Sequence, residues 1–192
     1  MSQNLVLAST SESRKKLLER LKIPFTVAPS NVDETVLPNE KPEDLVLRLA
    51  KLKAEAVATK FSDALIIGAD QVGVLENTIL CKPLNSKNAI EQLQFVSGKT
   101  VRFYIGVCLL NTKTKAQKIT LETFDVVFRA LSLSEIENYL KKEEVMNCAG
   151  SFKVEGLGIS LVEKLIGDDY TALIGLPLIK LVTLLKAEKY VI

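Results

Sequence analysis

The sequence predicts an α/β fold whose sheet is mixed and includes an antiparallel portion. In the first half of the chain, short apolar segments alternate with amphipathic ones, which is typical of strands connected by helices. Residues 101–110 and 117–128 are rich in β-branched and aromatic residues and flank a polar turn, which predicts an antiparallel strand pair. Hydrophobic residues make up 47% of the 192 positions, which is enough to build a substantial core.

The first elements follow from short local patterns. Residues 5–8 are apolar and predict a strand, and the next helix is expected to begin with a capping box formed by Ser9 and Glu12. Residues 25–28 predict a second strand. Residues 29–41 are polar and acidic and therefore predict a loop.

The next elements combine a helix, a buried strand and a hairpin. Pro42 suits the first turn of a helix, and apolar residues recur at helical spacing through residue 56. Residues 64–69 form an unbroken apolar run, which predicts a strand buried on both faces. Residues 72–75 and 78–81 are expected to form the two arms of a hairpin.

The last elements are helical, apart from one loop and one strand. Residues 86–96 and 132–142 predict helices, the second of them begun by another capping box. Residues 148–158 predict a glycine-punctuated loop, and residues 159–165 predict a strand. Residues 172–185 predict one buried C-terminal helix that is entered through a tight turn.

The composition narrows the possible chemistry and location. The chain has no histidine, so any acid–base step must use another side chain or a metal-bound water. The net charge of +2 is too balanced to predict a nucleic-acid partner. We expect no membrane partner, because no apolar stretch approaches the roughly 18 residues needed to span a bilayer. Cys81, Cys108 and Cys148 are too few and too widely spaced for a disulfide framework or zinc motif, so we expect reduced thiols, Cys108 in the core and a cytoplasmic location.

Asp70 is the strongest catalytic candidate. It directly follows the apolar run 64–69, so it is expected at the carboxyl end of a strand, where α/β proteins bind ligands. There it could hold a divalent metal ion or deprotonate a water molecule. The alternative is a structural Asp that caps a nearby helix or turn.

Several polar residues are candidates for binding phosphate. Ser9, Ser11 and Arg14 lie at the predicted start of a helix, where free N–H groups, hydroxyls and a guanidinium suit phosphate oxygens. Their alternative role is ordinary helix capping beside a solvated arginine. Lys53 on a helix and Lys82 on a loop are further candidate cations, each with a solvated alternative.

Two loops are candidates for metal and base recognition. Asp33 and Glu34 could supply a second carboxylate to a metal ion, or simply belong to a solvated acidic loop. The loop 150–156 contains an aromatic residue, a cation and an acid between glycines, and could hold a base or serve as a plain connection. The sequence has no P-loop, GxGxxG or CxxC motif.

Taken together, these segments resemble the Maf family of nucleotide pyrophosphatases through nearly the whole chain. Each motif is weak alone, and their order and spacing carry the resemblance. The matching motifs are Leu-Ala-Ser-Thr-Ser-x-x-Arg at 7–14, Val-Asp-Glu at 32–34, Arg-Leu-Ala-x-x-Lys at 48–53, Gly-Ala-Asp-Gln at 68–71, Lys-Pro at 82–83, Ala-Gly-Ser-Phe-Lys-x-Glu-Gly at 149–156 and Gly-Leu-Pro-Leu at 175–178.

The resemblance implies one domain over residues 1–192, with an elongated mixed sheet, flanking helices and two lobes around a central cleft, and often a homodimer. It implies hydrolysis of a nucleoside triphosphate between its α and β phosphates, with Mg²⁺ or Mn²⁺ as the divalent cofactor. By this similarity Asp70 is the proton acceptor. The other polar positions of the family's site match Arg14, Glu34, Lys53 and Lys82, and we expect Glu34 and Asp70 to bind the metal.

Within that family, the chain looks similar to the branch that hydrolyses 7-methyl-GTP. Positions 13, 71 and 155 match those associated with substrate choice, and here they are Ser13, Gln71 and Glu155. Ser13 departs from this branch, which often has a tryptophan there, and a hydroxyl cannot stack on a base. We expect Glu155 to favour the cationic methylated base, with Phe152 packing nearby.

Two alternative functions follow from the same resemblance. One is the same chemistry on dTTP, UTP or another modified nucleotide, although Gln71 and the contents of residues 149–156 argue against the dTTP branch. The other is a non-catalytic nucleotide sensor that regulates septum formation. The complete set of polar site residues argues against a loss of catalysis.

Overall fold

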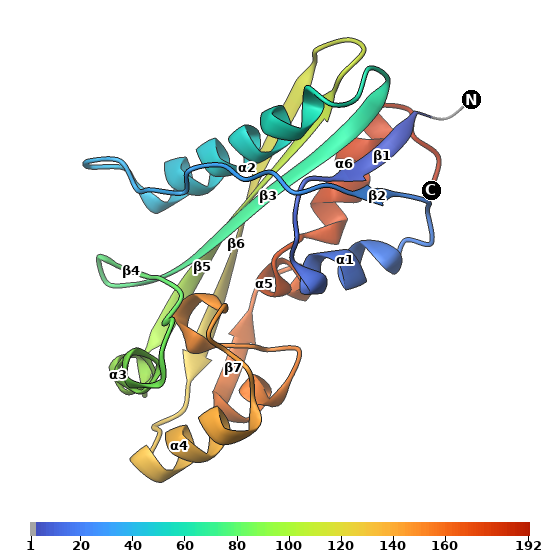
Figure 1. Ribbon diagram of the computed structural model, residues 1–192. Coiled ribbons are helices and arrows are strands. Elements are labelled where there is room, and N and C mark those ends of the chain that lie inside the picture. Colours follow the sequence, from blue (N-terminus) through green and yellow to red (C-terminus); the bar gives the residue numbers. More distant parts are fainter. Residues whose placement is uncertain (1–2) are drawn as a thin grey trace. The chain divides into compact units, whose positions relative to one another are not determined.

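The structure is a computed structural model that describes residues 3–192 (Figure 1). The chain folds into two compact units. Unit 1 comprises Met1–Gln71, Ile105–Glu122 and Asp169–Ile192, and unit 2 comprises Val72–Tyr104 and Thr123–Asp168. The long strands of the sheet pass from one unit into the other, so each unit contains only part of each of them.

The sheet is mixed, as the sequence predicts. Its strands are ordered β2-β1-β3-β5-β6-β7, and β4 also pairs with β3. Strand β1 pairs in parallel with both β2 and β3, whereas the pairs β3–β4 and β6–β7 are antiparallel. The strands are β1 (Asn4–Leu7), β2 (Thr26–Val27), β3 (Ala64–Leu75), β4 (Thr78–Leu80), β5 (Thr100–Asn111), β6 (Gln117–Phe128) and β7 (Val162–Ile166).

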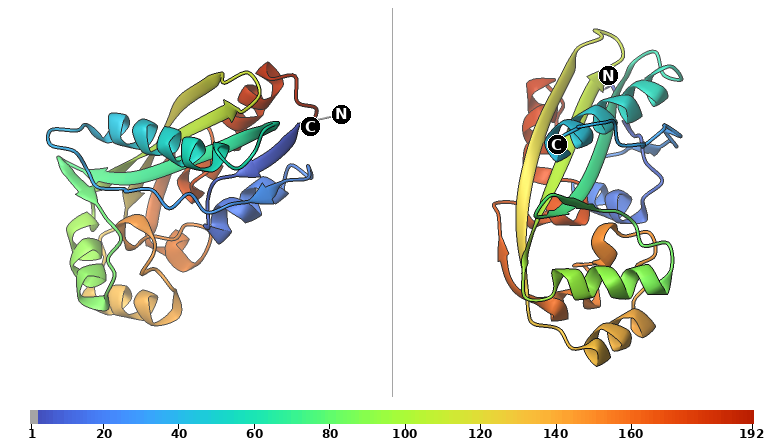
Figure 2. Two further views of the ribbon diagram at one scale, coloured as in Figure 1. Left: turned by 45° about the horizontal axis from the view of Figure 1, so that its top comes forward. Right: turned by 90° about the vertical axis from the view of Figure 1, so that its left-hand side faces the viewer.

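Four helices belong to unit 1 and cover both faces of its part of the sheet (Figures 1 and 2). Alternate residues of the strands feed two separate hydrophobic clusters, because successive side chains of a strand point to opposite faces. Helices α1 and α6 contribute to one cluster and helix α2 to the other. The helices are α1 (Glu12–Glu19), α2 (Pro42–Ala58), α5 (Tyr170–Ile174) and α6 (Leu178–Ala187).

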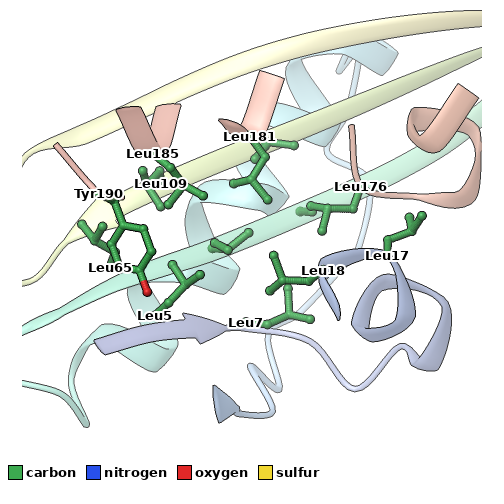
Figure 3. Packing of buried hydrophobic residues seen from close by; sticks show 13 residues of the cluster. Leu5, Leu7, Leu17, Leu18, Leu65, Leu109, Leu176, Leu181, Leu185 and Tyr190 are labelled. Carbon is green, nitrogen blue, oxygen red and sulfur yellow. The ribbon is translucent and has the colours of Figure 1, made fainter. Parts of the chain in front are cut away.

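The larger core cluster of unit 1 is built mainly from leucines. Leu5 and Leu7 of β1 and Leu65 of β3 pack with Leu17 and Leu18 of α1, all of them almost completely buried (Figure 3). Leucines of α6 and of the segment that precedes it close the same cluster. Since each buried leucine contributes about 1.5–3 kcal/mol, this cluster holds α1 and the C-terminal helices against the sheet.

Unit 2 has a core that contains several aromatic side chains. The ring of Phe152 lies 6.2 Å from that of Phe103 and 5.1 Å from that of Phe128, and all three side chains are buried. The ring of Phe152 is therefore part of this core, and the expectation that it also packs near the substrate base stays a prediction. The other elements of unit 2 are β4 (Thr78–Leu80), α3 (Ser86–Val96), α4 (Leu133–Lys142), η1 (Ala149–Ser151), η2 (Leu157–Leu161) and β7 (Val162–Ile166).

Most predicted elements are confirmed, and four predictions need correction. The capping box Ser9–Glu12 is wrong, because α1 begins at Glu12 and its cap is Ser11. The apolar run 64–69 is only the first half of β3, which continues to Leu75. The predicted strand 159–165 begins later, at Val162, after the 3-10 helix η2.

The fourth correction concerns the C-terminal helix predicted over residues 172–185. The structure has two helices there, α5 and α6, separated by Gly175 and Pro177. Gly175 has a φ of 119°, a conformation that ends α5, and Pro177 caps the next helix. The hydrophobic content of the segment therefore reflects two buried helices rather than one.

The three thiols of the chain are free, and Cys108 is completely buried in the core, as predicted. Burial raises the pKa of the Cys108 thiol to about 12, so it stays protonated and behaves as a small apolar residue. Within residues 3–192, no helix combines the length and the apolar character needed to cross a bilayer.

Candidate functional site

A charged cluster of unit 1 joins Lys53, Asp70 and Glu34. The ammonium of Lys53 lies 2.5 Å from Asp70 Oδ1 and 2.7 Å from Glu34 Oε1. Lys53 is 6% exposed and Asp70 7%, whereas the Glu34 side chain is half-exposed. Burying an unpaired charge costs free energy, so the ammonium of Lys53 needs these carboxylates as partners. Buried clusters of ionised side chains of this kind are frequent at functional sites.

The secondary structure brings Lys53 and Asp70 together. Asp70 occupies the same face of β3 as Ile66 and Gly68, and this face is covered by α2. Lys53 lies on α2 beside Ala50 and Ala54, the residues that meet that face. The solvated alternative for Lys53 is thus wrong, since its helix buries this position.

Gly68 allows α2 to lie unusually close to β3. A Cβ atom at this position would fall 2.0 Å from Ala50 O and 2.8 Å from Ala54 N. Only glycine therefore permits this helix-to-strand distance. The close approach lets the side chain of Lys53 reach Asp70 two residues farther along the strand.

The position of Asp70 differs from the one predicted. We expected it at the carboxyl end of a strand, but β3 continues through Asp70 to Leu75. The neighbouring strand β1 ends instead, because its pairing with β3 stops at Leu7 and Ile67. Asp70 thus lies beyond the last residue pair that β1 forms with β3. Asp70 is therefore next to the carboxyl end of β1 rather than at the carboxyl end of its own strand.

The loop that carries Glu34 is held by a set of hydrogen bonds. Asp33 Oδ1 accepts from the backbone and side chain of Thr35, and these bonds lower the pKa of Asp33. Arg48 of α2 donates to Thr35 O and forms two bonds to Glu40. Asp33 is therefore occupied in stabilising the loop, while Glu34 faces Lys53.

The first turn of α1 uses its two serines as caps. Ser9 Oγ accepts from Ser11 N at 3.1 Å, and Ser11 Oγ accepts from Arg14 N at 3.4 Å. The capping alternative is thus present, although each hydroxyl can still donate a bond of its own. Ser13 is in this first turn and is partly buried.

Arg14 points back toward the C-terminal helices of unit 1. Its Nε donates to Gly175 O at 2.9 Å. Burial lowers the pKa of Arg14 from its ordinary value, and the nearby carboxylates of Asp70 and Glu34 oppose that shift. The guanidinium remains charged and lies within electrostatic range of the carboxylate cluster.

Gln71 is anchored to the same helical segment as Arg14. Its Nε2 donates to Leu173 O at 2.8 Å. Because Gln71 follows Asp70 in a strand, the two side chains point to opposite faces of the sheet. The segment α5 and Gly175 therefore positions Arg14 and Gln71, two of the residues that the sequence singles out.

A buried acid fixes the turn between α5 and α6. Asp169 is 4% exposed, and its Oδ1 accepts from Thr171 N while its Oδ2 accepts from Ile179 N. Thr171 Oγ1 in turn accepts from Leu178 N. Sequence reasoning missed Asp169 and Gly175 as supports of the site, and the only signal was the Gly-Leu-Pro-Leu motif that begins at Gly175.

Replacing Gly175 by alanine is expected to weaken substrate binding. Its φ of 119° is unfavourable for alanine, and a Cβ would lie 3.1 Å from Gln71 Oε1 and 3.3 Å from Arg14 Nε. We expect a loss of about 1–3 kcal/mol of stability and a raised KM for the substrate, because Arg14 and Gln71 lose their anchor. Urea unfolding and steady-state kinetics measure the two effects, and unchanged values of both would contradict this interpretation.

Lys82 and Glu155 belong to unit 2, and both residues are exposed although the segments that carry them contact each other. Gly150 N donates to Cys81 O at 3.3 Å. Gln92 of α3 joins the same segments, because its Nε2 donates to Cys81 O and its Oε1 accepts from Ser151 Oγ. Gln92 was also missed from the sequence, where a glutamine on a helix carries no signal of this role.

The described residues 3–192 contain no group of three or more acidic or cysteine side chains arranged to hold a metal ion. Asp70 and Glu34 nevertheless supply two carboxylates that contact one common cation, Lys53. Mg²⁺ is usually bound by one or two carboxylates together with phosphate oxygens and water. The two residues therefore fit a metal site that the substrate would complete.

Comparison with known proteins places the chain in a family. The family described as Maf-like protein matches residues 4–188. The 7-methyl-GTP pyrophosphatase of Nitrosococcus oceani is 51% identical over 186 residues, which are 97% of this chain and 94% of that protein. The 7-methyl-GTP pyrophosphatase of Colwellia psychrerythraea is 54% identical over 184 residues, which are 96% of this chain and 92% of that protein.

A solved structure of the Staphylococcus aureus Ham1 protein is also similar, at 17% identity and a TM-score of 0.48. The alignment covers 67% of this chain and 73% of that one, and a likeness this distant carries no argument about function. The family match instead extends over nearly the whole chain, and the two relatives share half of its residues. This chain therefore belongs to the Maf-like protein family.

Proposed function

We propose that the protein hydrolyses nucleoside triphosphates between the α and β phosphates, and that its substrate is 7-methyl-GTP. The observation that carries the proposal is the buried pair of Lys53 and Asp70, with Glu34 in contact, in a chain of this family. The names of the two relatives, which are about half identical to this chain, support the choice of substrate.

In the proposed reaction Asp70 accepts a proton from the attacking water. Lys53 holds Asp70 Oδ1, which orients the carboxylate and leaves its second oxygen for the water's proton. The water oxygen forms a bond to the α-phosphorus, and the bond from that phosphorus to the bridging oxygen breaks. The products are a nucleoside monophosphate and pyrophosphate, and Arg14 lies near enough to the carboxylates to meet phosphate charge.

The charge of the cluster supports a divalent cofactor. Arg14 and Lys53 are balanced by Asp70 and Glu34, so the cluster has no net positive charge. A triphosphate carries about four negative charges at neutral pH, which such a cluster cannot offset alone. Mg²⁺ or Mn²⁺, held by the two carboxylates, would neutralise phosphate charge when bound. We expect turnover to stop when the metal is chelated.

The proposed preference for a methylated base rests on charge as well as on family. A guanine methylated at N7 is cationic, and Glu155 is an exposed carboxylate on the loop that joins η1 to η2. Gln71, whose amide is held at Leu173 O, is the second proposed specificity residue. The third is Ser13, which offers a hydroxyl and cannot stack.

Replacing Glu155 by glutamine is expected to lower the preference for 7-methyl-GTP over GTP. The change removes one negative charge and keeps the shape of the side chain, so binding of GTP itself should change little. The ratio of the two kcat/KM values measures the preference. If Glu155→Gln left that ratio unchanged, Glu155 would have no part in base selection.

The activity is tested by measuring pyrophosphate release from 7-methyl-GTP, GTP, dTTP, UTP and CTP, with and without Mg²⁺ or Mn²⁺. Metal-dependent release that is fastest with 7-methyl-GTP is the expected result. Faster release from dTTP, UTP or another nucleotide would retain the chemistry and overturn the substrate. Nucleotide binding without release from a folded protein would favour the sensor that regulates septum formation.

Three further expectations remain proposals: a single domain over residues 1–192 with its lobes around a cleft, a homodimer and a cytoplasmic location. Light scattering on the purified chain tests the homodimer through its mass. Calorimetric unfolding tests the single domain, because one cooperative unit gives equal calorimetric and van't Hoff enthalpies.

A further inference from the structure

Two residues of helix α4 and its C-cap in unit 2, Tyr139 and Glu143, bind the loop that carries Glu155. Tyr139 is 2% exposed, and its hydroxyl donates to Ser151 O and accepts from Lys153 N. At the C-cap of the same helix, Glu143 Oε1 lies 2.6 Å from Lys153 Nζ. Glu143 Oε2 accepts from Leu157 N at 2.7 Å. Glu143 thus binds the loop two residues before Glu155 and two residues after it.

The pairing also decides which charges the loop presents. Hydrogen bonding to Glu143 raises the pKa of Lys153, and the same bond lowers the pKa of Glu143. The Glu143 side chain is 13% exposed, so its carboxylate is mostly covered by the loop. The carboxylate of Glu155 also lies within electrostatic range of Lys153. Because Glu143 pairs with Lys153 at 2.6 Å, it offsets much of the positive charge that would otherwise act on the exposed side chain of Glu155.

We propose that Glu143 is a specificity-determining positioning residue, which neutralises Lys153 and so lets Glu155 select a cationic base. The proposal rests on the proposed function, because it concerns the preference of that same site for 7-methylguanine. Glu143 does not touch the base in this proposal and acts only through Lys153 and the loop backbone.

The physical consequence is a change in local charge. Without the carboxylate of Glu143, the ammonium of Lys153 would stand two residues from Glu155 and offset its attraction for the methylated base. The loop would then attract the cationic base of 7-methyl-GTP less strongly, while binding of the neutral guanine of GTP would change little. We expect the preference to fall by about fivefold, the order of one partly exposed ion pair.

The test replaces Glu143 by glutamine, which keeps the size of the side chain and one acceptor for Leu157 N. The matched control is Glu137→Gln, which removes an exposed carboxylate from helix α4, the helix that Glu143 follows. The readouts are the kcat/KM ratio for 7-methyl-GTP over GTP and, by calorimetry, the affinity ratio for 7-methyl-GMP over GMP. We expect both ratios to fall in Glu143→Gln and to stay unchanged in Glu137→Gln.

A second variant separates charge from loop structure. In the double variant Glu143→Gln with Lys153→Met, the uncompensated cation is gone, so both ratios should return toward the wild-type values. Unchanged ratios in Glu143→Gln, or no recovery in the double variant, would overturn the proposal. If the wild type released no pyrophosphate, the proposed activity would be overturned instead. The affinity ratio would then still test Glu143. A wild type that binds 7-methyl-GMP and GMP equally would overturn the role of Glu143.

Discussion

Replacing Asp70 by asparagine is expected to lower kcat by about 10²–10⁴-fold, the range that one general base contributes. Asparagine keeps the shape of the side chain and can still accept a bond from Lys53, but its amide cannot take a proton from water. Nucleotide affinity should be largely retained, because Arg14 and the first turn of α1 are unchanged. Pyrophosphate release and calorimetric titration with the nucleotide measure the two effects.

The control for this variant is Asp63→Asn, which removes an exposed carboxylate from the segment just before β3. Its activity should equal that of the wild type. Thermal unfolding of Asp70→Asn is needed as well, because the variant leaves the buried Lys53 with Glu34 as its only charged contact within this cluster. Near-normal kcat in a folded Asp70→Asn protein would rule out Asp70 as the base.

Replacing Gly68 by alanine should reduce both stability and activity. The new Cβ would lie 2.0 Å from Ala50 O, so α2 must move away from β3. Overpacking of this kind costs about 1–3 kcal/mol. Since Lys53 is on α2, the same movement should lengthen its contact with Asp70 and lower kcat. Urea unfolding and pyrophosphate release measure the two losses.

The matched control is Gly73→Ala, a change of the same type on the same strand. The nearest atom to its new Cβ is Phe103 Cε1 at 3.1 Å, a side-chain atom that can move by a few tenths of an ångström. We expect a smaller loss of stability from this variant and little effect on kcat. Equal effects of the two substitutions would mean that the close approach of α2 is not what places Lys53.

Local patterns predicted most of the fold correctly. Runs rich in β-branched and aromatic residues gave the right positions for the long strands β5 and β6, and the capping box at Ser132 is present as predicted. The errors at the start of α1 and between α5 and α6 concern local features, the cap Ser11 and the break at Gly175 and Pro177. The error in β3 arises because tertiary contacts override local preference. Asp70 interrupts an apolar run in the sequence, yet it continues a strand because Lys53 neutralises it in the interior.

The motifs of the sequence alone were sufficient to point to the family, since these depend on residue types and spacing. They also singled out Asp70 as the proposed base and a set of residues that we propose to bind phosphate. The pairing of Lys53 with both Asp70 and Glu34 depended on the tertiary structure, because it requires α2 to lie against Gly68 at a distance that no local pattern encodes. The same holds for Arg14 at Gly175 and for Glu143 at Lys153. These partners are far apart in the chain or hidden among ordinary surface charges, and only the packing of the folded chain selects them.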